Sequence, residues 1–316
     1  MEYRPIGKNG PDVSVIAFGC GPSAGLMVNG SASEQDAAVG LAIDLGVTVF
    51  DTASVYGAGA SEENLGGSLR RLSNGDRALI ATKFLVDWDG LADPGASVTR
   101  SIRESLDRIG RDRLDVIQMH NRVALDPPEG AAFAIGPMLS VSQVLGDGGV
   151  ADALEAAAAE GLVGGAGFTT FGGEVAAIEQ LIDSGRFQMI NGEFNMLNPT
   201  AVSTPAEAGV EPDYGGVMAR AHDRGMGVAV IRALVGGALV DPEQGVHPLA
   251  LARTQNPEHG PNVALAALVR EAHIGDARPL EHIAIDFVLS HEQISTAVLG
   301  FSSAAQVERS IAALAK

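Results

Sequence analysis

The chain has 316 residues, of which 46% are hydrophobic and 19% are charged, values typical of a globular protein with enough apolar side chains for a core. Its formal net charge of −18 argues against nucleic acid and anionic membranes as partners, because phosphate binding needs clustered Lys and Arg. The single cysteine, Cys20, excludes an intramolecular disulfide, and with no targeting segment or apolar run of membrane-spanning length we expect a cytoplasmic protein.

The first predicted element is an N-terminal β-hairpin. Residues 3–10 place the pair Asn9-Gly10 between two short runs, which is typical of a tight turn. We expect this hairpin to cap the bottom of a barrel, ahead of the first barrel strand.

Short β-branched runs then alternate with amphipathic helical segments along the whole chain. The predicted strands span residues 13–18, 47–50, 78–82, 115–119, 165–169, 188–194, 228–232 and 296–300. The predicted helices span residues 33–45, 61–71, 96–109, 150–160, 173–184, 214–224, 279–290 and 304–315. Eight strands, each followed by a helix, predict an α/β fold of the (β/α)₈ TIM-barrel type, with residues 1–316 forming a single domain.

An open doubly wound sheet is the alternative fold. It typically needs a glycine-rich dinucleotide turn after the first strand, and Gly19-Cys20-Gly21-Pro22 lacks the third spaced glycine. The sequence therefore favours the closed barrel.

Three connections exceed ordinary loop length, at 121–149, 196–213 and 240–278, and the last contains a predicted helix near 263–273. We expect these long loops to wall a substrate pocket on the active face.

Four polar side chains follow successive predicted strands: Asp51, Tyr56, Lys83 and His120. Neighbouring strands lie about 4.8 Å apart, so these side chains can converge. A tyrosine has a pKa near 10, but a nearby ammonium favours its phenolate, and a carboxylate can hold that lysine charged. A histidine beside it can donate a hydrogen bond to a carbonyl oxygen.

Together the four residues suit proton transfer coupled to hydride transfer. Taken singly, Lys83 could be a solvated charge and His120 a structural histidine. The other histidines lack ligand spacing, so we predict no metal site.

The segment from Phe50 to Gly66, with Thr82-Lys83 and Met119-His120, resembles the signatures of the aldo-keto reductases, and the likeness continues through nearly the whole chain. The resemblance implies an NAD(P)(H)-dependent oxidoreductase that interconverts an aldehyde, ketone or sugar lactol with an alcohol. It implies Tyr56 as general acid and base, Lys83 and Asp51 as residues that tune it, and His120 as the residue that orients the carbonyl.

The resemblance also implies the residues that bind the cofactor. Thr169, Thr170 and Asn191 would contact the nicotinamide carboxamide, Arg232 and Leu234 the pyrophosphate, and Gly300, Ser302, Ser303 and Gln306 the adenine-ribose phosphate. Gly19 and Cys20 would line the cofactor cleft. Many NADPH-preferring relatives carry Lys and Arg where this chain has Gly300 and Gln306, so both NADP(H) and NAD(H) remain open.

The expected substrate is a small carbonyl compound or sugar, because the last predicted helix ends near residue 316 without a long tail to enclose a bulkier one. Trp88 and Asn121 are candidates for the pocket wall, although a packing role for Trp88 is an alternative.

Two other functions remain open: an aldolase with Lys83 forming a Schiff base, and a cofactor-binding regulatory subunit resembling potassium-channel β subunits. No pattern indicates an oligomeric state.

Overall fold

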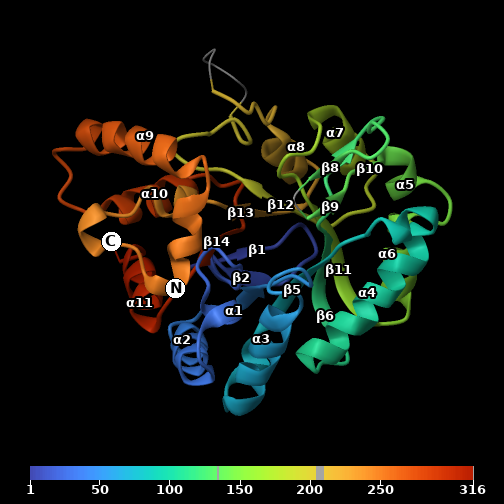
Figure 1. The fold of residues 1–316 in the computed structure, drawn as a ribbon, viewed down its shortest axis with the longest axis horizontal. Helices are drawn as coiled ribbons and strands as arrows, with labels where there is room; N and C mark the ends of the chain where they lie inside the picture. Colours follow the sequence, from blue (N-terminus) through green and yellow to red (C-terminus); the bar gives the residue numbers. More distant parts are fainter. Residues whose placement is uncertain (134, 204–209, 316) are drawn as a thin grey trace.

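Eight parallel strands close into a barrel in the computed structural model, which describes residues 1–133, 135–203 and 210–315 (Figure 1). Around the barrel the strands are β3 (Ile16–Gly19), β4 (Val49–Asp51), β5 (Leu79–Phe84), β6 (Leu114–Met119), β11 (Val163–Thr169), β12 (Met189–Glu193), β13 (Gly227–Ile231) and β14 (Thr296–Gly300), and β14 pairs again with β3. The expected (β/α)₈ barrel is confirmed.

Helices follow the strands and cover the outside of the barrel (Figure 1). They are α2 (Ala32–Asp44), α3 (Ala60–Arg71), α4 (Pro94–Ile109), α6 (Val150–Ala159), α7 (Val175–Asp183), α8 (Val217–Asp223), α10 (Leu280–Leu289) and α11 (Ala304–Ala312). Helix α4 illustrates why these segments form helices. Asp93 caps its N-terminus, Gly110 ends it in a left-handed conformation, and it buries Val98, Ile102 and Leu106 on one face. Each such side chain stabilises the fold by about 1.5–3 kcal/mol.

The N-terminal hairpin is present, but the expected tight turn at Asn9-Gly10 is wrong. Strands β1 (Tyr3–Pro5) and β2 (Asp12–Ser14) pair across a longer loop, residues 6–11. Gly7 takes the positive φ of 77° in this loop, and its carbonyl accepts a hydrogen bond from the amide of Gly10. The amide of Lys8 donates to the carbonyl of Gly225, which ties the loop to the barrel bottom. The expected strand 13–18 is consequently split between β2 and β3.

The long connections contain short elements that the sequence did not indicate. Residues 121–149 form β7 (Val123–Ala124), β8 (Ala132–Phe133), β9 (Gly136–Pro137), β10 (Leu139–Ser140) and α5 (Val141–Leu145). Residues 240–278 form the 3₁₀ helices η4 (Pro242–Gln244) and η5 (Pro248–Gln255), followed by α9 (His259–Ala272), which includes the helix expected near 263–273. Smaller elements elsewhere are α1 (Leu26–Asn29), η1 (Gly75–Arg77), η2 (Asp89–Ala92) and η3 (Val235–Gly237). Residues 204–209 of the expected loop 196–213 lie outside the described residues.

Two kinds of feature are absent from the described residues, 1–133, 135–203 and 210–315. No helix there combines the length and the apolar character that crossing a bilayer requires. Across the same ranges, no three His, Cys, Asp or Glu side chains gather in a way that could hold a metal ion.

Candidate active site

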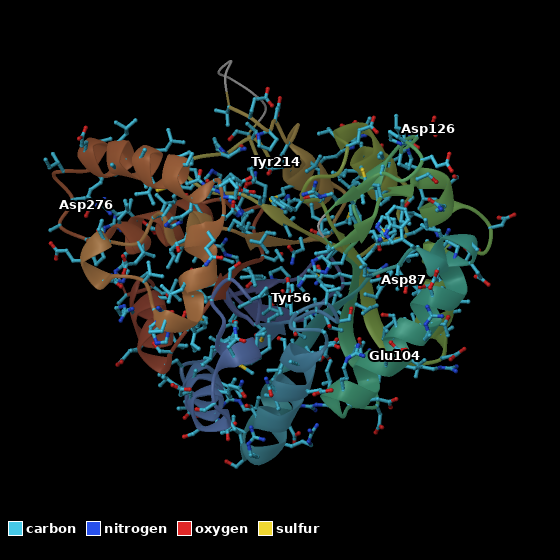
Figure 2. All side chains as sticks on the ribbon, in the orientation of Figure 1. Tyr56, Asp87, Glu104, Asp126, Tyr214 and Asp276 are labelled. Atoms are coloured by element: carbon cyan, nitrogen blue, oxygen red, sulfur yellow. The ribbon has the colours of Figure 1, made fainter. Side chains whose placement is uncertain are left out.

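The four side chains predicted to converge do lie together at the carboxyl ends of β4, β5 and β6. The Lys83 ammonium donates hydrogen bonds to Asp51 Oδ1, to the carbonyl of Thr52 at 2.8 Å and to Tyr56 Oη at 3.5 Å. The Tyr56 ring meets the His120 ring edge-on, with centroids 5.7 Å apart. Figure 2 shows Tyr56 near the middle of the molecule, whereas Glu104, Asp126 and Asp276 lie at its periphery.

Tyr56 is placed by the tight path of the chain between β4 and α3. Its amide donates to the carbonyl of Ala53 at 3.1 Å, and Gly57 continues the turn with a φ of 62°. Behind this turn, the Thr52 and Ser61 hydroxyls lie 2.9 Å apart, and Ser61 also donates to the carbonyl of Cys20. The loop is therefore fastened to β3, and Tyr56 is fixed above the barrel.

Lys83 is a buried, charged lysine. Its side chain is 2% exposed and that of its partner Asp51 is 6% exposed. Burial alone would lower the pKa of Lys83, but the Asp51 charge and the hydrogen bonds to Asp51 and Tyr56 outweigh it, and the pKa is raised. Since an ammonium has three donors and all three are used, Lys83 is held as a fixed positive charge.

Tyr56 carries its proton in this arrangement. The Lys83 charge lowers the pKa of the phenol, as expected, but burial raises it more and the Asp51 charge adds to that rise. The net direction is upward: Lys83 favours the phenolate as predicted, but burial, the largest cause, outweighs it. Tyr56 is therefore protonated at neutral pH, with the Lys83 ammonium 3.5 Å from its Oη.

His120 is neutral. Burial, and then the Lys83 charge, lower the pKa of His120 to about 3. Its Nδ1 atom is buried and has no hydrogen-bond partner within residues 1–133, 135–203 and 210–315. A neutral imidazole has one N–H donor, so His120 can donate one hydrogen bond to a carbonyl oxygen but cannot act as a cationic acid near pH 7.

We expect acid to destabilise the protein through His120. The folded-state pKa lies below the unfolded value near 6.5, so the stability gained from the neutral form is lost as the pH falls below 6.5. Between pH 7 and pH 5 this group should account for about 2 kcal/mol of the unfolding free energy. Urea unfolding of the wild type and of His120→Gln at both pH values measures it. Equal losses in the two proteins would contradict the neutral assignment.

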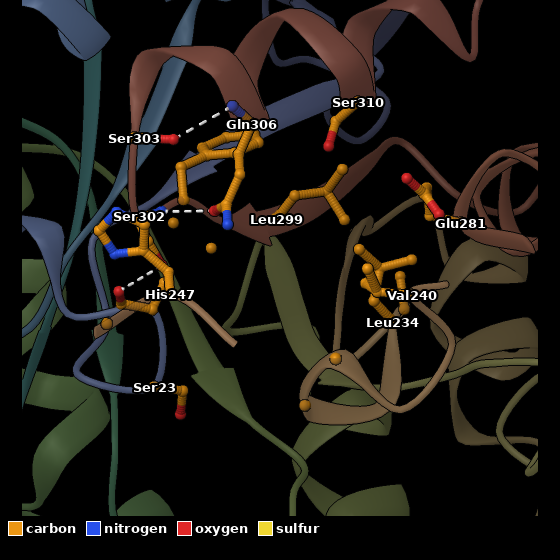
Figure 3. A pocket seen from close by; sticks show the side chains of 18 of the residues that line it. Ser23, Leu234, Val240, His247, Glu281, Leu299, Ser302, Ser303, Gln306 and Ser310 are labelled. Atoms are coloured by element: carbon orange, nitrogen blue, oxygen red, sulfur yellow. Dashed lines mark hydrogen bonds between the residues drawn. The ribbon is translucent and has the colours of Figure 1, made fainter. Parts of the chain in front are cut away.

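A groove of about 600 Å³ extends from Asp51 and Tyr56 to the start of α11. Figure 3 shows its lining near Ser302, Ser303 and Gln306. Asp51 and Tyr56 line its inner end. Seven of the residues predicted to bind the cofactor line it further along: Gly19, Arg232, Leu234, Gly300, Ser302, Ser303 and Gln306.

The far end of the groove is held by hydrogen bonds at the start of α11. Gln306 Oε1 accepts from the amide of Ser302 at 2.7 Å, and the Ser302 hydroxyl donates to the carbonyl of Ala24. Ser303 caps the helix by accepting from the Gln306 amide (Figure 3). A capped helix start of this kind offers N–H groups and small side chains to an anion.

Arg232 has a strained backbone, with a φ of 57° that non-glycine residues rarely adopt. Its Nε lies 3.1 Å from Glu193 Oε1, and its Nη2 lies 3.1 Å from Glu258 Oε2. Because Glu258 directly precedes α9, Arg232 links the barrel to the segment 240–278 beside the groove. Such strain persists only where the surroundings hold the residue in place.

Other predicted site residues lie elsewhere. Cys20 is buried, and Gly21 rather than Cys20 reaches the groove. Thr169, Thr170 and Asn191 are buried, and Asn191 Nδ2 lies 3.5 Å from Asp51 Oδ2. None of the three lines the groove.

The two residues predicted to wall the substrate pocket, Asn121 and Trp88, lie in different surroundings. Asn121 is 1% exposed, and its side-chain amide bonds the backbone of Val86 and the carbonyl of Pro137. Its side chain therefore joins the segments that contain Val86 and Pro137. Trp88 is 49% exposed, so the alternative of a packing role in the core is wrong.

Several groove residues were not predicted. They are Ser23, Ala24, Val240, Glu281, Ser310 and residues 244–248. The length of the connection 240–278 indicated a wall on the active face, and its first part does cover the groove. The sequence held no signal for which of its side chains would face inward.

Comparison with known proteins identifies related sequences. The sequence profile described as the aldo/keto reductase family matches residues 16–316. The chain is 29% identical to the aldo-keto reductase YhdN of Bacillus subtilis over 149 residues, covering 46% of this chain and 45% of that protein. It is 33% identical to the L-glyceraldehyde 3-phosphate reductase of Escherichia coli K12, covering 46% and 44%. A probable voltage-gated potassium channel subunit beta of Oryza sativa is 31% identical, covering 43% and 42%.

These matches span less than half the length of each curated relative. Among solved structures, the holo form of aldo-keto reductase AKR11C1 from Bacillus halodurans superposes with a TM-score of 0.69 at 20% identity, covering all of this chain and 91% of that one. At that identity the superposition supports the barrel fold alone.

Proposed function

Because this chain belongs to the aldo/keto reductase family, we propose that it is an NAD(P)(H)-dependent oxidoreductase that interconverts an aldehyde, a ketone or a sugar lactol with the corresponding alcohol. One observation carries the proposal. Tyr56, hydrogen-bonded to a buried Lys83–Asp51 pair, stands at the inner end of a groove that leads to the capped start of α11.

Each of the four residues has a distinct role in this reaction. Tyr56 donates its proton to the carbonyl oxygen, and Lys83 stabilises the phenolate that remains. Asp51 keeps Lys83 charged and in place. His120, neutral, donates a hydrogen bond to the same oxygen and so stabilises the charge that develops there. The nicotinamide, when bound, supplies or accepts the hydride.

The groove fits a dinucleotide in its chemistry. Its inner end carries the proton donor, and its outer end has the small and hydroxyl residues Gly300, Ser302 and Ser303 at a helix start.

Arg309 is the basic side chain on α11 that lines the outer end of the groove. We therefore expect the protein to bind both NADPH and NADH, with Arg309 contacting the extra phosphate of NADPH. Arg309→Gln should weaken NADPH binding by about fivefold, the value of an exposed ion pair, and leave NADH binding unchanged. Titration of nicotinamide fluorescence measures both. An equal loss for the two cofactors would contradict this role.

Turnover tests the function itself. Purified protein is incubated with NADH or NADPH and a panel of aldehydes, ketones and sugars, and nicotinamide absorbance is followed. Oxidation of the cofactor that depends on the carbonyl is expected. Cofactor binding without turnover of any substrate would instead favour the regulatory alternative, which the resemblance to a potassium channel subunit beta keeps open.

An aldolase is the less favoured alternative. Schiff-base formation needs a neutral lysine with a lowered pKa, whereas the pKa of Lys83 is raised and its three donors are engaged. Borohydride added with substrate should therefore leave no covalent adduct on Lys83, as checked by mass spectrometry.

A further inference from the structure

The two carboxylate oxygens of Asp51 have different partners. Oδ1 accepts from Lys83, whereas Oδ2 faces two amides: Gln118 Nε2 at 3.3 Å and Asn191 Nδ2 at 3.5 Å. Neither amide belongs to the four residues that carry the proposed chemistry. Both are buried, Gln118 at 0% and Asn191 at 1% exposure.

The barrel places Gln118 directly beside the catalytic lysine. Gln118 of β6 is the register partner of Lys83 of β5, so the two side chains point into the barrel at the same level. Asn191 approaches the same carboxylate from β12. The carboxylate is thus held from one side by the ammonium and from the other by two amides.

The orientation of both amides follows from the charge of Asp51. An ionised carboxylate only accepts hydrogen bonds, so each amide must turn its nitrogen towards it. Gln118 Oε1 and Asn191 Oδ1 are then buried with no hydrogen-bond partner among the residues that the structure describes. A buried acceptor without a partner is destabilising, so the hydrogen bonds to Asp51 must offset that loss.

We propose that Gln118 is a positioning residue that holds the Asp51 carboxylate so that Lys83 stays against Tyr56. The inference rests on the proposed oxidoreductase function, since it assigns Gln118 a part in that reaction. Without the amide, the carboxylate can rotate, Lys83 follows it, and the contact between Lys83 and Tyr56 weakens.

The pKa of Tyr56 depends on the charged and titratable groups that lie around Asp51 and Tyr56. Asp51 and Tyr56 are faced by Lys83 from β5 and by Cys20, which follows β3. The neutral ring of His120, which follows β6, contacts Tyr56. Lys83 lowers the pKa of Tyr56, so a looser Lys83 should let that pKa rise.

The test compares Gln118→Leu with Gln35→Leu. Gln35 is also buried, but its amide donates only to the backbone carbonyls of Leu26 and Gly30 near α2. Gln118→Leu should lower kcat by about 10- to 100-fold, the value of a hydrogen bond to a charged group, whereas Gln35→Leu should keep the wild-type kcat.

A second measurement is independent of turnover. The chain has three tyrosines, so isotope-labelled tyrosine gives a simple NMR spectrum in which Tyr56→Phe identifies the signal of Tyr56. Gln118→Leu should move the titration of Tyr56 to higher pH, and Gln35→Leu should not. An unchanged or lowered Tyr56 pKa in Gln118→Leu overturns the proposal even if the variant is less active.

Gln118→Glu should make the activity depend on pH in a way that a purely structural role of Gln118 would not. The new carboxyl can donate to Asp51 Oδ2 while it is protonated, but repels Asp51 when ionised. Activity should therefore approach that of the wild type at acidic pH and fall as the pH rises. A pH profile parallel to that of the wild type would overturn the proposal.

If the wild type reduces no carbonyl but Gln118→Leu still shifts the Tyr56 titration, the proposed function fails and the positioning role stands.

Discussion

Tyr56→Phe should abolish most of the reductase activity while leaving the fold intact. The substitution removes one hydroxyl and keeps the ring that packs against His120. Loss of the proton donor should lower kcat by about a thousandfold, within the range expected for general acid catalysis. Steady-state kinetics with the best carbonyl substrate measures the loss, and cofactor binding by fluorescence should be unchanged because the groove remains.

Tyr3→Phe is the matched control. The Tyr3 hydroxyl donates to the carbonyl of Gly46, and Tyr3 belongs to the hairpin at the opposite end of the barrel from the active site. Its loss should leave kcat unaltered. Near-normal turnover by Tyr56→Phe would show that another group delivers the proton and would remove the basis of the mechanism. Deep losses of activity and of cofactor binding together would indicate a structural defect instead.

The strands and helices of the barrel could be predicted because their signals are local and repeated. The prediction for β14 matches its observed bounds, 296–300, and most other elements differ by one to three residues. The hairpin shows the limit. Asn9-Gly10 is a strong turn signal, but the loop is set by the left-handed Gly7 and by the bond from Lys8 to Gly225, a residue distant in sequence. A two-residue motif such as Asn9-Gly10 carries no information about a contact with a residue as distant in sequence as Gly225.

The site residues likewise include some that the sequence could predict and some that it could not. Asp51, Tyr56, Lys83 and His120 could be predicted because each lies at or after the carboxyl end of a strand, and parallel strands bring those ends together. The direction of side chains in irregular loops could not. Gly21 and not Cys20 reaches the groove, and Asn121 turns inward to bond Val86. Gln118 was missed because a polar residue inside a predicted strand carries no local sign that its partner is a carboxylate on another strand.

The largest effect on stability should come from separating Lys83 and Asp51. Lys83→Met leaves the Asp51 carboxylate buried without its counter-charge, which typically costs about 3–5 kcal/mol. Asp51→Asn leaves the Lys83 ammonium in the same position and should cost a similar amount. Both variants should also lose nearly all activity, because Tyr56 loses the charge that stabilises its phenolate.

The double variant separates these two consequences. Asp51→Asn with Lys83→Met contains neither charge, so its loss of stability should be well below the sum of the single losses, while its activity stays as low as theirs. Urea unfolding and kcat/KM of the four proteins complete the cycle. Arg108→Met is the control: Glu62 is fully buried and lies 2.6 Å from Arg108, so this variant should lose stability but keep turnover. Additive losses in the cycle would mean that Lys83 and Asp51 do not act as a pair, and Asp51 would then need a role other than holding the lysine.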